Sequence, residues 1–428
     1  MPRNDIIIPP AKNVTGAVRL PGDKSISHRY AMLGALAQGT TRLRNFSTGA
    51  DCASTLGALS SVGVAVRHGE AGAVEIEGSL WRAPRAPLDC GNSGSTMRML
   101  SGILAGQPFT SELTGDDSLS RRPMARVIEP LAKMGAHIEA AAGGRPPLRI
   151  TGHALQAIHY RLPVASAQVK TAILFATLFA QGRTTVEEPV RTRDHGELAL
   201  PAFGAALARD GNRVTMTGGQ KLHAIEAGIP GDISSAAFFL CAAALFPGSN
   251  LLLDSVLMNP TRAGLLDVLI GMGCRISVVN LEEHHGELVG TVAVEGAQLK
   301  GTTISGALSA ALIDELPVLA AIAPYTTGGI EIRDARELRV KESDRIAAVA
   351  ANLRALGATV EEREDGLRVP GNQQLHGAEV DSAGDHRIAM AFAVAALRAT
   401  GDTLIRGAGA AQISYPEFFT TLEAIVER

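Results

Sequence analysis

Six times along the chain, a stretch rich in alanine and leucine ends at a glycine and leads into a short run of β-forming residues. This repeat constrains the fold more than any other feature, because every copy has to form the same kind of structural unit. Glycine directly after an apolar helical stretch is typical of a helix C-terminus, where the backbone enters the left-handed region. The six glycines lie about 66 to 80 residues apart: Gly39, Gly106, Gly182, Gly248, Gly328 and Gly401.

A second glycine follows in five of the six copies, in "LSSVGVAVR", "LAKMGAHIEA", "PAFGAALARD", "LIGMGCRISVV" and "LRALGATVEE". Each copy therefore predicts a strand-helix-strand-helix-strand order with short connections, which is typical of a compact α/β unit. A chain of 428 residues is too long for one ordinary hydrophobic core. We expect two domains of three copies each, divided close to residues 228–232.

The composition indicates a soluble globular protein, with 46% hydrophobic and 19% charged residues. A net charge of −3 and a pI near 6.4 argue against general attraction to nucleic acid or anionic membranes. The N-terminus has no apolar signal segment, and the longest apolar run, 236–246, is too short to cross a bilayer, so we expect a cytoplasmic protein. The four separated cysteines predict buried free thiols, and neither cysteines nor histidines show metal-ligand spacing.

Five of the predicted helices begin alike, with Asp, Asn or Ser at or beside the N-cap: "GDKSISHR", "GNSGSTMR", "ASAQVKTA", "GDISSAAF" and "GDHRIAMA". Helix capping alone explains most of this pattern. Three of the starts add cations or a small-residue loop at the exposed amide end of the helix, where phosphate and carboxylate groups bind. A nucleotide-binding P-loop is not supported, because "GDKS" lacks the glycine spacing of that motif.

Charged side chains gather in further short segments: "SLSRRPM", "LIDELPVLA", "ELRVKESDRI" and "AGDHRIAM". Taken singly, each of them also fits a solvated or salt-bridged helix face. The acids Asp314 and Glu315 stand between apolar residues, where a buried carboxylate needs a partner or a function.

Taken together and in this order, "PGDKSISHR", "GNSGSTMR", "RRPM", "SAQVK", "DELP", "RVKESDR" and "GDHRIAM" resemble the 5-enolpyruvylshikimate-3-phosphate synthase family. The resemblance covers residues 14 to 420. It implies transfer of the enolpyruvyl group of phosphoenolpyruvate to the 5-hydroxyl of shikimate 3-phosphate, with no metal and no cofactor. Both substrates carry a phosphate and a carboxylate, which accounts for local cations in a slightly acidic chain. We expect these two small molecules as the partners of a monomer that binds neither nucleic acid nor membrane.

The resemblance also implies roles for individual residues. Those expected to bind shikimate 3-phosphate are Lys24, Ser25, Arg29, Ser166, Ala167, Gln168, Arg193, Asp314 and Lys341. Those expected to bind phosphoenolpyruvate are Lys24, Gly94, Arg122, Gln168, Arg345 and Arg387. The expected catalytic residues are Asp314 as the base at the hydroxyl, and Glu342 or Lys24 as the acid at the methylene carbon.

The implied fold class is α/β, a two-domain inside-out α/β barrel with helices inside and sheets outside. Each domain is expected to hold three β-α-β-α-β-β units. The first would combine residues 1–20 with 230–428, and the second would span 21–229, so that the chain crosses twice.

Two positions differ in an informative way from relatives. Ile413 stands where many members carry a lysine that contacts phosphoenolpyruvate. Members with glycine at the position of Gly94 generally admit glyphosate, an inhibitor that occupies the phosphoenolpyruvate pocket and is slightly longer than phosphoenolpyruvate. Members with alanine place a methyl group in that pocket. The segments "SAQVK", "TRDH" and "RVKESDR" resemble the members that carry alanine, so they conflict with Gly94.

Two other functions remain open on the sequence. The sister enolpyruvyl transferase that acts on UDP-N-acetylglucosamine usually has a cysteine before its "RP" arginine, and "TGDDSLSRRP" has none. An RNA-end-processing or RNA-binding repeat protein would need basic patches and aromatic residues for stacking, and aromatics make up only 4% of the chain.

Overall fold

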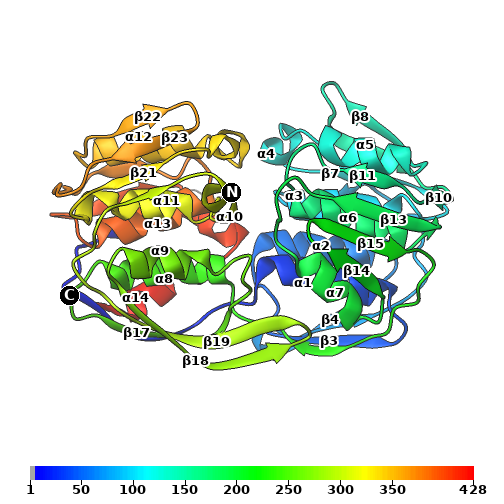
Figure 1. The fold of residues 1–428 in the computed structure, drawn as a ribbon, viewed down its shortest axis with the longest axis horizontal. Coiled ribbons are helices and arrows are strands. Elements are labelled where there is room, and N and C mark those ends of the chain that lie inside the picture. Colours follow the sequence, from blue (N-terminus) through cyan, green and yellow to red (C-terminus); the bar gives the residue numbers. More distant parts are fainter. Residues whose placement is uncertain (1–4) are drawn as a thin grey trace. The chain divides into compact units, whose positions relative to one another are not determined.

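The computed structural model describes residues 5–428, and the chain divides into two compact units (Figure 1). Unit 1 consists of the residues up to Pro21, Pro230–Glu282 and Leu288–Arg428. Unit 2 consists of Gly22–Ile229 and Glu283–Glu287.

Three four-stranded sheets with one shared topology form the outside of unit 2. In each sheet the first two strands are parallel and the other neighbours are antiparallel. Their orders are β16 (Glu226–Gly228), β3 (Thr40–Arg44), β5 (Val74–Glu77), β4 (Ala65–His68); β6 (Leu88–Asp89), β7 (Thr110–Thr114), β9 (Arg145–Thr151), β8 (His137–Ala141); and β11 (His159–Arg161), β13 (Arg183–Glu187), β15 (Arg213–Thr217), β14 (Leu207–Asp210). A short parallel pair joins β10 (Leu155–Gln156) to β12 (Ala180–Gln181).

The helices of unit 2 pack against these sheets, some of them buried on all faces and others with one exposed face. They are α1 (Lys24–Leu36), α2 (Ala50–Ser61), α3 (Gly94–Leu104), α4 (Asp117–Ser120), α5 (Ala125–Lys133), α6 (Ala167–Thr177) and α7 (His195–Ala202), with a 3-10 turn at Glu70–Gly72. Helix α3 packs against α6, and α1 packs against α2, α3 and α7. Helices α1, α3 and α6 are buried over most of their length, so residues on all their faces belong to the core, including polar side chains such as His28, Arg29 and Lys170.

Unit 1 repeats this plan, and its N-terminal strands complete two of its sheets. The orders are β18 (Arg275–His284), β19 (Glu287–Glu295), β17 (Asn250–Leu257), β2 (Asn13–Arg19), β26 (Val426–Glu427); β20 (Thr302–Ile304), β21 (Ile330–Ile332), β23 (Gly366–Val369), β22 (Glu361–Arg363); and β1 (Ile6–Ile8), β25 (Thr403–Arg406), β24 (Glu379–Asp381). Strand β2 pairs in parallel with β17, and β1 pairs antiparallel with β25.

The helices of unit 1 differ in burial in the same way. They are α8 (Ile233–Ala244), α9 (Gly264–Gly271), α10 (Ala307–Ala311), α11 (Leu316–Ile322), α12 (Arg345–Ala355), α13 (His386–Ala396) and α14 (Phe418–Ala424), with 3-10 turns at Ala323–Tyr325, Arg336–Val340 and Ala408–Ile413. Every residue of α8 and α13 is buried. Helix α13 packs against α8, α11 and α12, so this helix is the centre of the core.

The glycines of the repeat behave mostly as the sequence predicts. All five glycines of the second signature have positive φ: Gly63, Gly135, Gly204, Gly273 and Gly357. In the first signature the prediction is wrong for Gly106 and Gly328, which do not have positive φ. A Cβ on Gly106 would lie 2.5 Å from Phe179, so close packing explains this glycine, and the left-handed residue of the other turn is Gly329.

The α/β class with internal helices and external sheets is confirmed, while the sheets among residues 5–428 are separate and open rather than closed into one barrel. All four cysteines are free and buried, as the sequence predicts. No helix in the described part of the chain is long and apolar enough to span a bilayer.

Candidate functional site

The predicted N-caps are confirmed at all five helix starts. Each capping side chain accepts a hydrogen bond from a backbone N–H in the first turn, at distances of 2.8 to 3.4 Å. The caps are Asp23 on α1, Ser93 on α3, Ser166 on α6, Asp232 on α8 and Asp385 on α13. The caps fix the backbone of these starts, and four of them lie next to predicted binding residues.

At the start of α1, two cations are held in different ways. The Nζ of Lys24 lies 2.9 Å from Oδ2 of Asp51, the second residue of α2. Arg29, one turn further along α1, donates from Nη1 to the backbone oxygen of Ser25 at 2.8 Å and from Nη2 to Oγ1 of Thr171 on α6 at 3.0 Å. The guanidinium of Arg29 thus ties α1 to α6.

Arg29 is a buried cation whose hydrogen bonds go to neutral oxygens. It is 3% exposed, and among the described residues no carboxylate lies within ion-pairing distance of it. Burial lowers the pKa of Arg29 to about 10, although the charges of Glu197 and Asp23, which do not contact it, oppose this shift. A buried charge is costly unless an opposite charge contacts it. An anionic ligand at this guanidinium would supply that charge.

A hydrogen-bonded chain joins the starts of α3 and α6. Arg98 donates from Nη1 to Oε1 of Gln168 at 2.8 Å, and Gln168 donates from Nε2 to Oγ of Ser95, also at 2.8 Å. The amide of Gln168 is therefore oriented by two side chains of α3. Sequence reasoning did not select Arg98 or Ser95, although both stand in the "GNSGSTMR" motif.

Arg122, which follows α4, lies beside the same loop. Its Nη2 donates to Oδ1 of Asn92 at 2.7 Å and to Oγ of Ser118 at 3.2 Å. A Cβ added to Gly94 would lie 2.8 Å from Nη1 of Arg98 and 3.4 Å from Nη1 of Arg122. The absence of a side chain at position 94 thus leaves room for two guanidinium groups.

Behind the start of α6 lies a buried ion cluster. The Nζ of Lys170 is fully buried and lies 2.7 Å from Oε2 of Glu188 and 2.7 Å from Oε1 of Glu197. Since Ser166 and Ala167 begin this helix, the cluster anchors the segment that carries both predicted contacts. Arg193 is half-buried just before α7.

In unit 1, Arg345 is the centre of a cluster of carboxylates. Its Nε lies 2.8 Å from Oδ2 of Asp385, its Nη1 3.3 Å from Oδ1 of Asp314, and its Nη2 2.5 Å from Oε2 of Glu342. Burial opposes the charge of Arg345, which is 1% exposed, but the three carboxylates raise its pKa above the ordinary value. This guanidinium is a permanent cation that contacts both carboxylates predicted to be catalytic, Asp314 and Glu342.

Asp314 contacts two further cations from other segments. The Nζ of Lys341 lies 3.6 Å and Nε of Arg387 3.9 Å from its Oδ1. Arg387 also donates from Nη1 to the backbone oxygen of Asp314 at 3.0 Å. The Asp314 side chain is 15% exposed, so this carboxylate is reachable while three cations hold it.

The structure therefore brings the predicted residues together within each unit. Unit 2 holds Lys24, Ser25, Arg29, Gly94, Arg122, Ser166, Ala167, Gln168 and Arg193, and unit 1 holds Asp314, Lys341, Glu342, Arg345 and Arg387. Their partners Asp51, Asn92 and Thr171 gave no sequence signal, because the contacts depend on segments far apart in the chain. Ile413 is 1% exposed at the end of a 3-10 turn, so its side chain belongs to the core.

No group of three or more His, Cys, Asp or Glu among residues 5–428 is arranged to hold a metal ion. The charged groups of the site are thus arginines, lysines and carboxylates that pair with one another.

Residues 8–422 match the family model described as EPSP synthase (3-phosphoshikimate 1-carboxyvinyltransferase). The chain belongs to the EPSP synthase family. Two curated relatives with the name 3-phosphoshikimate 1-carboxyvinyltransferase support this EPSP synthase assignment over nearly their whole length. The one from Koribacter versatilis is 63% identical over 423 residues, covering 98% of this chain and 99% of the relative. The one from Solibacter usitatus is 56% identical, with the same coverage.

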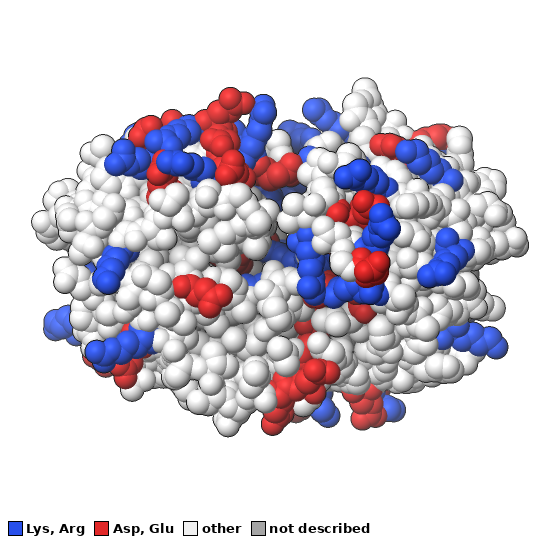
Figure 2. Space-filling view, viewed as in Figure 1, with Lys and Arg blue, Asp and Glu red and all other residues white. Residues whose placement is uncertain are grey.

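The EPSP synthase fold is also found by comparison with solved structures. EPSP synthase from Acinetobacter baumannii superimposes with a TM-score of 0.88 at 41% identity, covering 99% of this chain and 98% of that one. The family match favours EPSP synthase over the UDP-N-acetylglucosamine transferase and the RNA-related alternatives. On the face drawn in Figure 2, basic and acidic side chains are interspersed, unlike the continuous basic surface of a nucleic-acid-binding protein.

Proposed function

We propose that this chain transfers the enolpyruvyl group of phosphoenolpyruvate to the 5-hydroxyl of shikimate 3-phosphate and releases phosphate. The observation that carries the proposal is the cluster around Arg345, in which two part-exposed carboxylates, Asp314 and Glu342, contact one buried cation. Two anionic substrates need cations for binding, and the reaction needs groups that exchange protons. This cluster supplies both kinds of group.

Shikimate 3-phosphate is proposed to bind the cations and helix starts of unit 2, together with Asp314 and Lys341. The buried guanidinium of Arg29 supports this proposal, because an anionic group would supply the charge that its protein partners lack. The remaining contacts proposed for this substrate are Lys24, Ser25, Ser166, Ala167, Gln168 and Arg193.

Phosphoenolpyruvate is proposed to bind three arginines, whose planar forks can each bond two oxygens of a carboxylate or phosphate. These are Arg122, Arg345 and Arg387, with Lys24, Gly94 and Gln168 as further contacts. The hydrogen bonds that hold Arg122 and Gln168 support this assignment, since they fix both groups before any ligand binds.

In the proposed reaction, the 5-hydroxyl oxygen attacks C2 of phosphoenolpyruvate while Asp314 takes the hydroxyl proton. Glu342 or Lys24 gives a proton to C3, which becomes a methyl group, so the product of addition is a tetrahedral intermediate. In the second step the C2–O bond to phosphate breaks and C3 loses a proton, which restores the double bond. Every proton taken up by the protein in one step is returned in the other.

We further propose that the chain acts as a monomer in the cytoplasm. Strands β1 and β2 complete the sheets of unit 1 within a single chain, and the four free buried thiols fit a reducing compartment. The molar mass, measured by light scattering as the protein elutes from a size-exclusion column, tests whether it is a monomer.

The proposed function is tested by measuring phosphate release from phosphoenolpyruvate with different acceptors. Rapid release is expected only with shikimate 3-phosphate, and not with UDP-N-acetylglucosamine or with phosphoenolpyruvate alone. A Glu342→Gln protein purified in the same way shows whether any activity comes from a contaminant. Release with UDP-N-acetylglucosamine, or without an acceptor, would overturn the proposal.

A further inference from the structure

A hollow in unit 2 lies at the opposite ends of the helices that carry the predicted binding residues. Helices α1, α3 and α6 begin at Lys24, Gly94 and Ala167, and the hollow is lined by Leu36, Gln107 and Leu178, which lie at or just beyond their C-termini. Since α1 has 13 residues, the two ends of that helix are about 20 Å apart. The hollow is thus separate from the candidate site, and no role proposed above uses it.

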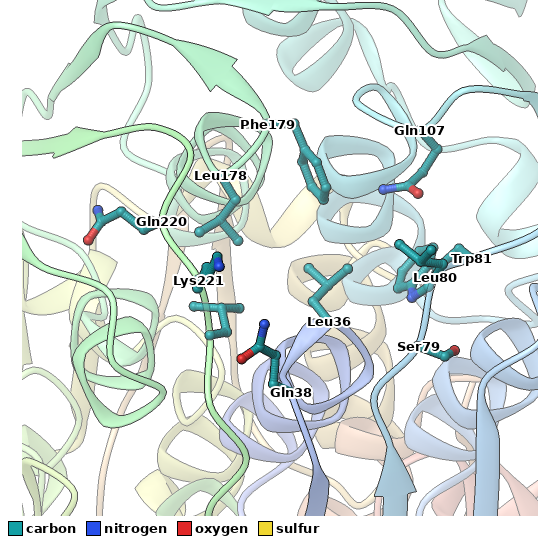
Figure 3. Close-up of a pocket in the computed structure, with 11 residues that line it drawn as sticks. Leu36, Gln38, Ser79, Leu80, Trp81, Gln107, Leu178, Phe179, Gln220 and Lys221 are labelled. Atoms are coloured by element: carbon teal, nitrogen blue, oxygen red, sulfur yellow. The ribbon is translucent and has the colours of Figure 1, made fainter.

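The hollow has a volume of about 230 Å³, and most of its wall is apolar. Leu36 at the end of α1, and Leu178 and Phe179 just after α6, line it together, with Leu80 and Trp81 on another side (Figure 3). Leu80 is 93% exposed, although a leucine of this size gains stability from burial. A ligand with a flat apolar body would cover this wall, as in other small-molecule sites.

The polar groups at the hollow favour an anionic ligand. Lys221 is exposed, and among the residues that the structure describes no carboxylate lies within ion-pairing distance of its Nζ. The amides of Gln38 and Gln107 also line the hollow. Two amides at the hollow are already used. That of Gln220 bonds the backbone of Ala206 and Thr217, and Nε2 of the buried Gln107 donates to the backbone oxygen of Ile103 at 3.4 Å.

We propose that this hollow is a second ligand site, for a small aromatic monocarboxylate. The apolar wall takes the ring, and the carboxylate lies at Lys221 with the amide of Gln38 beside it. A single cation suits one negative charge, whereas the candidate site described above, with its several cations, suits ligands that carry a phosphate as well as a carboxylate. The half-buried ring of Phe179 offers a stacking surface for the aromatic body, whereas the indole of Trp81, which is 7% exposed, contributes a largely buried part of the wall.

The chain carries its own reporter for this site. Trp81 is the single tryptophan in the sequence, and its Nε1 donates to the backbone oxygen of Ala35 at 3.2 Å. Its emission therefore comes from one fixed indole in the wall of the hollow. Binding there changes the surroundings of this indole directly, whereas binding at the start of α1 takes place about a helix length away.

The test is a titration of the full-length protein with phenylacetate, followed through Trp81 emission, with the uncharged analogue phenylacetamide in parallel. We expect saturable binding of phenylacetate with a Kd in the millimolar range, as for a fragment of about ten heavy atoms. Lys221→Gln should weaken phenylacetate binding by about 3- to 10-fold and leave phenylacetamide binding unchanged. Gln38→Glu should weaken it as well, because a carboxylate would then face a carboxylate.

Lys300→Gln is the matched control, since Lys300 is also an exposed lysine but does not line the hollow. Its affinity for phenylacetate should equal that of the wild type. The proposal is wrong if Trp81 emission shows no saturable response, if phenylacetamide binds as tightly as phenylacetate, or if Lys221→Gln and Lys300→Gln bind phenylacetate equally well. Phosphate release by Lys221→Gln is measured separately, and normal turnover is expected, so this result does not depend on the proposed function.

Discussion

Replacing Gly94 by alanine should weaken glyphosate binding more than phosphoenolpyruvate binding. The added Cβ would lie 2.8 Å from Nη1 of Arg98, closer than side-chain atoms normally approach, and 3.4 Å from Nη1 of Arg122, which is ordinary contact. Arg98 therefore has to move, although it is held to Gln168 by a 2.8 Å hydrogen bond. Because Nη1 is the end of a flexible side chain, Arg98 can shift in the free protein, and the cost arises when the longer inhibitor has to share the proposed pocket with the methyl group and the shifted guanidinium. Overpacking of this kind costs roughly 1–3 kcal/mol. We expect the inhibition constant of glyphosate to rise by about one to two orders of magnitude.

The assay compares the inhibition constant of glyphosate with the KM of phosphoenolpyruvate in the wild type and in Gly94→Ala. The wild type should be inhibited competitively with phosphoenolpyruvate. Gly57→Ala is the control, because a Cβ added at this exposed position of α2 meets nothing within 4 Å. Its constants should match those of the wild type.

A double variant tests whether the methyl group acts through Arg98. If it does, the effects of Gly94→Ala and Arg98→Ala should not add, since removing the guanidinium also removes the clash. A wild type that tolerates glyphosate, or a Gly94→Ala protein that is equally sensitive, would refute the reasoning. Strict additivity would show that the methyl group acts directly on the inhibitor instead.

Three other perturbations follow from the same contacts. Asp314→Asn and Glu342→Gln should each lower kcat by about two to four orders of magnitude. Calorimetry should show that the Glu342 variant still binds shikimate 3-phosphate. Near-normal turnover in either variant would mean that the residue is only an ion-pair partner. Asp385→Asn should lower the free energy of unfolding in urea by about 3–5 kcal/mol, because it removes the one fully buried carboxylate of the three that contact buried Arg345. Glu361→Gln on the surface should change the free energy of unfolding little. Burial and the charges of Lys24 and Arg29 hold the pKa of His28 well below 6.5. Below about pH 6.5 the unfolded chain therefore binds a proton that the folded chain does not, and the free energy of unfolding should fall by up to about 1.4 kcal/mol per pH unit. An equally steep fall in His28→Gln would contradict this explanation.

The repeat in the sequence was sufficient to predict the α/β class, the N-caps and most of the glycine turns. These features depend on local chemistry: a capping side chain reaches an N–H two or three residues away, and a positive φ depends on the residue itself. The two exceptions, Gly106 and Gly328, are positions where a neighbouring segment decides the conformation. Phe179, 73 residues further along the chain, fills the space next to Gly106.

The candidate site was predictable only in part. The cations and acids were found because they stand in short motifs at helix starts. Their partners Asp51, Asn92 and Thr171 come from other helices and loops, and no local pattern marks them. The hollow beside Trp81 was missed for the same reason, because it is built from residues that follow three different helices.

The most direct test of the proposed reaction is to follow both substrates by phosphorus and proton NMR in D2O. The account predicts that phosphoenolpyruvate is replaced by inorganic phosphate in a one-to-one ratio with the loss of shikimate 3-phosphate. It also predicts deuterium in the methylene group of the product, because C3 passes through a methyl group before it loses a proton. Phosphate formed while shikimate 3-phosphate stays unchanged, or a product methylene without deuterium, would contradict enolpyruvyl transfer by addition and elimination.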